Sequence, residues 1–251
     1  MSYTIAITGK GGTGKTTIAA LLVANLVRRG KRPVLAVDAD PNSCLDLALG
    51  VKAANTVGRL REDARDLAAA NPALSKRELL EMKISESLVE GDDFDLIAMG
   101  RPEGPGCYCY ANNVLRDVLA EISGSYPYVV LDNEAGLENL SRRIVTRVDL
   151  LLVAGDTSRN GLETIRRVHG LSREMGISFG KLGIIVNRVR REGEGDTYSS
   201  LKTALAAEYL ITLPYDDAVL DWNERGESLM TLPDDNPVNR AMGAFISELS
   251  L

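Results

Sequence analysis

The chain has 251 residues, of which 45% are hydrophobic and 25% charged, a balance that is ordinary for one globular α/β domain. Its net charge of −6 at pH 7 disfavours non-specific binding to nucleic acid. It contains neither a signal-peptide pattern nor an apolar run near the ~20 residues that span a bilayer. We therefore expect a cytoplasmic protein that binds no nucleic acid and no membrane, in which the cysteines are thiols or metal ligands rather than disulfides.

Short apolar runs alternate with helical patterns along almost the whole chain. The runs are rich in β-branched residues and apolar on both faces, which is typical of parallel strands covered by helices. In chain order, we expect strands at 3–8, 33–38, 94–99, 128–132, 150–154, 182–187 and 210–213, with helices at 16–29 and 112–123. The pattern predicts one doubly wound, mostly parallel α/β sheet flanked by helices, in a single domain over 1–251 with a helical insertion at about 51–93.

The connection after the first strand satisfies the phosphate-binding pattern G-x-x-x-x-G-K-[ST]. Its glycines allow positive φ and bring successive N–H groups close to phosphate oxygens. Its lysine supplies a charge to the β- and γ-phosphates, and the hydroxyl that follows is placed to ligate Mg²⁺. We therefore expect a nucleotide-binding protein. The residues are Gly9, Lys10, Gly11, Gly12, Thr13, Gly14, Lys15, Thr16 and Thr17, of which Lys15 is the P-loop lysine and Thr16 the expected Mg²⁺ ligand.

Carboxylates follow two of the predicted strands, at the sheet edge where open α/β folds bind ligands. Asp38 ends the second strand, and Asp40 follows it before a proline. Asp132 ends a later strand, as in a Walker B pattern, whose carboxylate holds Mg²⁺ directly or through water. A strand-ending aspartate can also be only a cap on the next turn, but the P-loop favours a metal-related role for Asp132.

The second P-loop lysine, Lys10, together with the Asp-x-Asp-Pro strand end, resembles the deviant Walker A ATPases, which include MinD, ParA, the Mrp proteins and nitrogenase iron protein. The resemblance implies Mg²⁺-dependent ATP hydrolysis in a homodimer in which Lys10 reaches the partner's nucleotide. It also implies that Asp40 orients the attacking water and that Asp38 lies near the magnesium shell. A cation supplied by the partner would stabilise the transition state as an arginine finger does. The expected catalytic residues are thus Lys10, Lys15, Asp40 and Asp132.

The same resemblance implies base recognition at two later strand ends. Asn187 and Arg188 match the family's asparagine loop that reads the adenine edge, and Pro214 and Asp216 match its second adenine-contacting loop. The chain lacks the N-K-x-D motif that recognises guanine, so we expect ATP rather than GTP. An asparagine at a strand end is also a common cap, and that alternative stays open for Asn187.

Two cysteines, Cys107 and Cys109, lie between a predicted strand and the helix that follows it. A disulfide between them would be strained, and two thiolates supply only half of a tetrahedral Zn²⁺ or square-planar Ni²⁺ site. A two-fold dimer would supply the other half, so the sequence predicts a metal that bridges two subunits. The alternative is a pair of small buried hydrophobes. For Cys44 we expect a core position, and for His169 a helix cap or a solvated face.

Residues 132–142 (D-N-E-A-G-L-E-N-L-S-R) resemble the switch II segment of the CooC/AcsF-type ATPases, which also carry a C-x-C in the equivalent loop. The resemblance implies an ATP-dependent metallochaperone that binds Ni²⁺ or Zn²⁺ at Cys107 and Cys109 across the homodimer interface. Its client would be a nickel enzyme, carbon monoxide dehydrogenase or acetyl-CoA synthase, and hydrolysis would open the dimer and release the metal. Asp132 and Glu134 lie on the segment that would link the nucleotide to the metal.

Two other functions stay open. One is an iron–sulfur redox ATPase like nitrogenase iron protein, although residues 133–136, after the Walker B strand, contain no cysteine. The other is a positioning ATPase of the MinD/ParA class. Its MinD members end in a basic membrane helix, whereas this chain ends in an acidic, weakly amphipathic segment. The net charge also argues against the basic surface that ParA proteins need for DNA.

Overall fold

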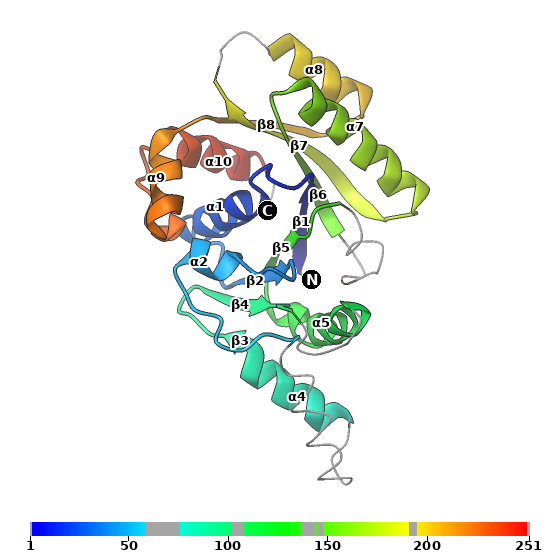
Figure 1. Cartoon of the computed structure of the whole chain (residues 1–251), viewed down its shortest axis with the longest axis vertical. Coiled ribbons are helices and arrows are strands. Elements are labelled where there is room, and N and C mark those ends of the chain that lie inside the picture. Colours follow the sequence, from blue (N-terminus) through cyan, green and yellow to red (C-terminus); the bar gives the residue numbers. More distant parts are fainter. Residues whose placement is uncertain are drawn as a thin grey trace.

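An eight-stranded sheet runs through the middle of the computed structural model, which describes residues 2–58, 76–101, 108–136, 144, 148–190 and 195–249 (Figure 1). The strand order is β3-β4-β2-β5-β1-β6-β7-β8. Neighbouring strands are parallel except β3 and β4, which pair antiparallel. The predicted doubly wound, mostly parallel sheet is confirmed.

The elements alternate along the chain as strands and helices do in βαβ units. The strands are β1 (Tyr3–Gly9), β2 (Val34–Ala39), β3 (Leu88–Val89), β4 (Phe94–Ala98), β5 (Tyr128–Asn133), β6 (Val148–Asp156), β7 (Phe179–Val189) and β8 (Tyr209–Pro214). The helices and 3-10 turns are α1 (Lys15–Arg28), α2 (Leu45–Leu49), α4 (Lys76–Ser87), α5 (Tyr108–Ile122), η1 (Ser123–Ser125), α7 (Arg159–Glu174), α8 (Gly195–Ala204), α9 (Asp217–Arg225), η2 (Leu229–Thr231) and α10 (Pro237–Glu248).

Helices cover both faces of the sheet. On one face lie α1, α2, α9 and α10, and on the other α5, α7 and α8 (Figure 1), and each face has its own hydrophobic cluster. Successive strand residues point to opposite faces, so Ile5 and Ile7 pack with the α1 cluster, whereas Ala6 packs with the α5 cluster. Because both faces are covered, the strands read as continuous apolar runs rather than as alternating patterns.

Helix α1 begins directly after the P-loop and is buried around most of its circumference, from Ile18 to Leu26. A helix with no solvent face needs no polar stripe, which explains its almost wholly apolar sequence. Its last residue, Arg28, donates hydrogen bonds of 2.8 and 2.7 Å to the carbonyl oxygens of Met230 and Leu232. These contacts tie the C-terminal part of the chain to the helix that presents the P-loop.

The segment between α2 and β4 contains α4 and the short strand β3, and residues 59–75 lie outside the described part of the chain. The single domain with a helical insertion at 51–93 therefore stays a prediction. Across the described ranges, no helix is both long and apolar enough to cross a membrane.

Candidate active site

The P-loop leaves the end of β1 and leads into α1. Its last glycine, Gly14, caps the helix with a φ of 87°, which is the left-handed conformation that favours glycine. A Cβ at Gly14 would lie 2.6 Å from Nδ2 of Asn187. That amide nitrogen donates a 2.8 Å hydrogen bond to the carbonyl oxygen of Thr13. The turn therefore requires glycine at this position for its backbone conformation and for the close approach of Asn187.

The two P-loop lysines lie in different environments. Lys15 is buried, with 8% of its surface exposed, and its Nζ lies 3.4 Å from the carbonyl oxygen of Lys10, to which it donates. Burial lowers the pKa of Lys15, and nearby carboxylates, led by Asp132, oppose that shift. Lys10 is exposed, and its carbonyl oxygen also accepts from Oγ1 of Thr13 at 2.8 Å. Lys15 thus points inward, whereas the ammonium of Lys10 is accessible from outside the chain.

Two predicted carboxylates, Asp38 and Asp132, lie side by side because their strands, β2 and β5, pair in register at these residues. Both side chains are buried, with 0% and 1% of their surface exposed. Burial, together with the neighbouring charge of Asp132, raises the pKa of Asp38 to about 7. Burial likewise raises the pKa of Asp132 to about 6, although a hydrogen bond from Thr16 and the charge of Lys15 lower it. Two buried like charges are costly unless a cation joins them.

The donor set around these carboxylates fits a divalent cation. Asp132 accepts a hydrogen bond from the Thr16 hydroxyl, while its buried Oδ1 has no hydrogen-bond partner. Asp38 is oriented by the backbone N–H groups of Asp40 and Leu45, at 3.0 and 2.9 Å. Carboxylate and hydroxyl oxygens are the ligands that Mg²⁺ prefers. The predicted Mg²⁺ ligands Thr16 and Asp38 are therefore brought together with Asp132.

The third acidic residue, Asp40, lies beyond the end of β2 and is half-buried. Its Oδ1 accepts hydrogen bonds from the backbone N and the side-chain Nδ2 of Asn42, at 2.8 and 3.0 Å. This turn, rather than the strand, sets the direction of the carboxylate. Asp40 shares the sheet edge with Asp38 and Asp132, and its backbone N–H donates to Asp38, but Asn42 orients its carboxylate.

The chain after Asp132 is fastened to the base of the P-loop. Nδ2 of Asn133 donates to the carbonyl oxygen of Ile7 at 2.9 Å, and the N–H of Gly136 donates to that of Gly9 at 3.1 Å. Residues 137–143, the rest of the predicted switch segment, lie outside the described residues. A displacement of the P-loop would therefore also move residues 133–136, at the start of the switch segment.

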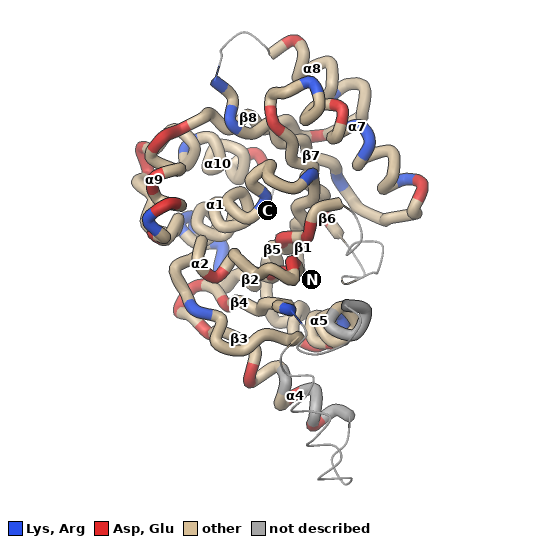
Figure 2. The backbone as a smooth tube through the Cα atoms, in the orientation of Figure 1, with Lys and Arg blue, Asp and Glu red and all other residues tan. Residues whose placement is uncertain are grey.

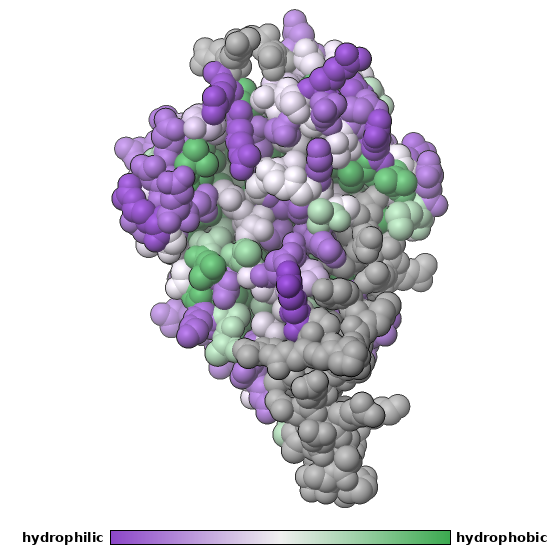
Figure 3. All heavy atoms as spheres, viewed as in Figure 1, coloured by the Kyte–Doolittle hydropathy of each residue, from purple (hydrophilic) through white to green (hydrophobic). Residues whose placement is uncertain are grey.

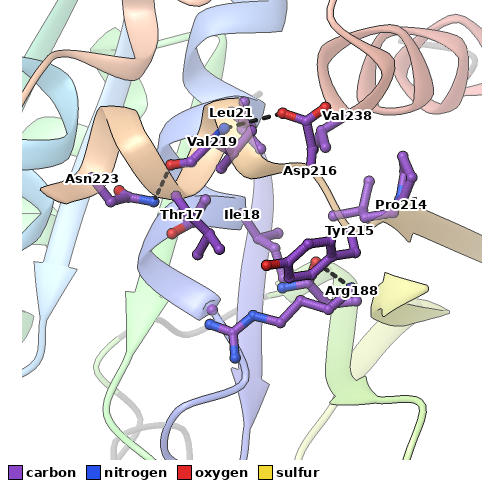
Figure 4. A pocket seen from close by; sticks show the side chains of 14 residues that line it. Thr17, Ile18, Leu21, Arg188, Pro214, Tyr215, Asp216, Val219, Asn223 and Val238 are labelled. Atoms are coloured by element: carbon purple, nitrogen blue, oxygen red, sulfur yellow. Dashed lines mark hydrogen bonds between the residues drawn. The ribbon is translucent and has the colours of Figure 1, made fainter. Parts of the chain in front are cut away.

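A pocket that is partly open to solvent lies beside the P-loop. Six of the predicted nucleotide-binding residues line it, namely Gly14, Thr17, Asn187, Arg188, Pro214 and Asp216. Figure 4 shows the side chains of α1 facing the β8–α9 connection, with Tyr215 beside Arg188. The guanidinium of Arg190 stacks over the ring of Tyr215 at 3.9 Å. A pocket with apolar walls and a few polar groups is suited to a small aromatic ligand such as a nucleotide base.

A family model described as the CobQ/CobB/MinD/ParA nucleotide binding domain (CbiA) matches residues 4–229. The chain belongs to this family. An uncharacterized ATP-binding protein of Methanocaldococcus jannaschii is 40% identical over 237 residues, which cover 93% of each chain. The carbon monoxide dehydrogenase accessory protein CooC of Rhodospirillum rubrum is 30% identical over 240 residues, covering 91% of this chain and 89% of CooC.

A solved structure of the septum site-determining protein MinD from Pyrococcus horikoshii, complexed with Mg-ADP, has the same fold. It superposes with a TM-score of 0.73 at 20% identity and covers 100% of this chain and 96% of MinD. At this level of identity the likeness extends to the fold alone, and the chain is a nucleotide-binding domain of MinD/ParA type.

Within this MinD/ParA-type site, the side chains of Asp216 and Asn187 already make hydrogen bonds within the chain. Oδ1 of Asp216 caps α9 by accepting from the N–H of Val219 at 3.1 Å, and it also accepts from Nδ2 of Asn236 at 3.0 Å. Oδ1 of Asn187 accepts from the backbone N–H of Arg188 at 2.9 Å. Their predicted contacts with adenine stay predictions.

The cysteine predictions have different outcomes. Cys107 lies outside the described residues, and the backbone of Cys109 belongs to the first turn of α5, earlier than the helix start predicted at 112. The core position predicted for Cys44 is wrong, because its side chain is exposed at the N-terminus of the short helix α2. His169 lies inside α7 and is half-buried. In the described ranges, no three His, Cys, Asp or Glu side chains gather as a metal site.

Several pocket residues escaped the sequence analysis because they belong to amphipathic or buried positions that look like ordinary core. They are Ile18, Leu21, Leu213, Val219, Leu220, Asn223 and Val238. Asn236 was also missed, although an asparagine followed by proline before an apolar helical pattern is a recognisable helix-start signal.

Proposed function

We propose that this chain is a Mg²⁺-dependent ATPase that acts as a metallochaperone for a nickel enzyme. The ATPase part is supported by the buried pair Asp38 and Asp132, which lies next to the Thr16 hydroxyl and the Lys15 ammonium. The metallochaperone part is supported by the 30% identity to CooC and by the cysteine pair Cys107 and Cys109. The client would be carbon monoxide dehydrogenase or acetyl-CoA synthase.

The residues around the nucleotide have separate tasks in this proposal. Lys15 and the P-loop N–H groups bind the phosphates, and the base lies in the pocket lined by Asn187 and Asp216. Mg²⁺ held by Thr16, Asp38 and Asp132 would neutralise charge on the phosphates. Asp40 orients the attacking water on the γ-phosphate.

Lys10 would act on the nucleotide of a second copy. Among the described residues, its ammonium makes no ion pair, and it is exposed beside the P-loop. A cation in that position can stabilise the transition state of phosphoryl transfer in the partner. ATP would therefore favour the homodimer, and hydrolysis would allow it to open.

The cargo would be held by Cys107 and Cys109 of both copies. Four thiolates satisfy a tetrahedral Zn²⁺ or a square-planar Ni²⁺ ion, whereas one copy cannot. Closing the dimer with ATP would assemble the site, and opening it after hydrolysis would release the metal to the client enzyme.

Metal titration together with the mass in solution tests the proposal. Anaerobic full-length protein is titrated with Ni²⁺ and with Zn²⁺, with and without Mg-ATP. We expect one ion per two chains, dimerisation on binding, and loss of both effects in Cys107→Ser/Cys109→Ser. Cys44→Ser is the matched control, because it removes an exposed thiol and should change nothing.

Two results would contradict the proposal in different ways. If no metal binds through Cys107 and Cys109 in any nucleotide state, the metallochaperone function is wrong and a positioning ATPase remains. If the anaerobic protein is brown with a visible absorption band, the same thiolates hold an iron–sulfur cluster.

A further inference from the structure

The turn that carries Asp40 is fastened at two points to the chain that follows β4. Oγ of Ser43 accepts a 3.0 Å hydrogen bond from the N–H of Gly100, and it donates to the carbonyl oxygen of Asp40 at 3.1 Å. Next to it, Nη2 of Arg101 donates to Oδ1 of Asn42. Residues far apart in the sequence thus meet around the turn that holds the expected catalytic carboxylate.

Asn42 is also the residue that orients this carboxylate. Its backbone N and its Nδ2 both donate to Oδ1 of Asp40, while its own Oδ1 accepts from Arg101. Among the described residues, Oδ2 of Asp40 has no hydrogen-bond donor, so it is available to a water molecule. Hydrogen bonds therefore run without interruption from Arg101 through Asn42 to Asp40.

The backbone that leads into Arg101 is itself held by hydrogen bonds at the end of β4. The N–H groups of Val57 and Gly58 donate to the carbonyl oxygens of Ala98 and Met99 at 3.0 and 2.7 Å. Gly100 has a φ of 63°, and a Cβ there would lie 2.2 Å from Oγ1 of Thr56. Arg101 therefore starts from a fixed backbone, although its side chain is exposed.

We propose that Arg101 and Asn42 are positioning residues for Asp40, and that they hold its carboxylate in the working direction. This inference rests on the proposed function, because it takes Asp40 as the residue that orients water.

The test measures kcat and KM for ATP on the full chain without Ni²⁺ or Zn²⁺. Arg101→Ala and Asn42→Ala should each lower kcat about tenfold and leave KM unchanged, because a misdirected carboxylate impairs the chemical step rather than nucleotide binding. The double variant should be no slower than the slower single variant, since both residues act through one connection. Arg101→Lys keeps a donor and should recover part of the loss.

The control for this test is Arg32→Ala, which removes an exposed arginine paired with Asp93 beyond the opposite end of β2. It should leave kcat unchanged. Wild-type kcat in both single variants, or fully additive losses in the double variant, would overturn the positioning role. If Asp40→Ala itself hydrolyses ATP at the wild-type rate, the role of Asp40 and the inference built on it are both wrong.

If the wild type binds no metal, the proposed function fails, whereas the metal-free kinetics still decide whether Arg101 and Asn42 position Asp40.

Discussion

Asp132 is a buried carboxylate whose charge the Thr16 hydroxyl and the Lys15 ammonium offset only in part. Its Oδ1 is buried without a partner beside Asp38, and burial raises the pKa of both side chains. Asp132→Asn would keep an acceptor for Thr16 and put an N–H group where the unpaired oxygen lies. We expect it to raise the unfolding free energy of the metal-free protein by about 1–3 kcal/mol.

The measurement for Asp132→Asn is the Tm at pH 8 in EDTA, where each kcal/mol amounts to roughly 2–4 °C for a chain of this size. The gain in Tm that Mg-ATP gives the wild type should at the same time shrink. Asp149→Asn is the control, because Asp149 is buried and accepts from the N–H of Thr4, and its substitution should not raise Tm. A lower Tm for Asp132→Asn in EDTA would mean that the two carboxylates do not repel each other.

Two P-loop glycines provide a matched pair for the contact with Asn187. Gly12 and Gly14 have similar φ values, 81° and 87°, but a Cβ would meet nothing within 4 Å at Gly12 and the Asn187 amide at Gly14. Both alanine variants should lose about 1 kcal/mol of unfolding free energy to backbone strain. Gly14→Ala should lose about 1–2 kcal/mol more, because Asn187 must move.

Chemical unfolding of the two glycine variants measures this difference. Adding Asn187→Ala should remove the excess loss of Gly14→Ala, since the clash then disappears. Equal losses for Gly12→Ala and Gly14→Ala would mean that Asn187 adjusts without cost. The close approach of Asn187 would then not explain why position 14 requires glycine.

At the scale of elements, the caps of α9 and α10 are joined to each other beside the pocket. Asp216 caps α9, Asn236 caps α10, and Nδ2 of Asn236 donates to Oδ1 of Asp216 at 3.0 Å. Both helices contribute pocket walls, through Val219 and Val238. The position of α10 is therefore coupled to the shape of this pocket.

Exchanging the two cap residues tests this coupling. Asn236→Asp alone brings two carboxylates together and should lower the unfolding free energy by about 2 kcal/mol and weaken ATP binding. Asp216→Asn/Asn236→Asp restores the hydrogen bond with donor and acceptor reversed, and both residues remain good caps. Tm and the Kd for ATP should then recover together. An unchanged Kd for ATP in the destabilised single variant would show that the pocket does not depend on the position of α10.

The strands were predictable because a sheet that is covered on both faces leaves continuous apolar runs in the sequence. The prediction was less accurate at the ends of the elements. The expected strands at 128–132 and 210–213 are β5 and β8, each within a residue or two. The two-residue strand β3 is too short to show a period. Helix α5 starts at Tyr108 rather than at 112, because its first turn, Y-C-Y-A, lacks the apolar spacing of the rest.

The candidate site was predictable wherever a motif fixes both residue type and spacing. The P-loop, Asp38 and Asp132 meet as expected, since parallel strands bring their ends to one edge. Asn42 was not predictable, because its contact with Arg101 joins segments distant in sequence. Asn236 was recognisable as a helix start, but its contact with Asp216 was not. The exposure of Cys44 follows from the turn at Asp40, which the sequence pattern does not describe.

At the scale of the whole molecule, acidic and basic residues are interspersed along the elements that the structure describes. Figure 2 shows basic and acidic residues interspersed along α7 and α9, and the face in Figure 3 is mostly polar with small apolar patches. Mixed charge of this kind does not drive a chain onto polyanions. Association of two copies would therefore depend on local groups, and the accessible Lys10 is the group that a nucleotide in the partner would attract.

Lys10→Ala should therefore separate nucleotide binding from dimerisation. We expect it to bind Mg-ATP, because Lys15 remains, but to lose the ATP-dependent dimer and at least about 10²-fold in kcat, in line with the effect of arginine fingers. Sedimentation in the Asp40→Ala background, with Mg-ATP and without Ni²⁺ or Zn²⁺, measures dimerisation without turnover. Asp40→Ala should be dimeric, Asp40→Ala/Lys10→Ala monomeric, and the control Asp40→Ala/Lys52→Ala, which removes an exposed lysine, dimeric. A dimer that persists without Lys10 would show that ATP closes the molecule through other contacts.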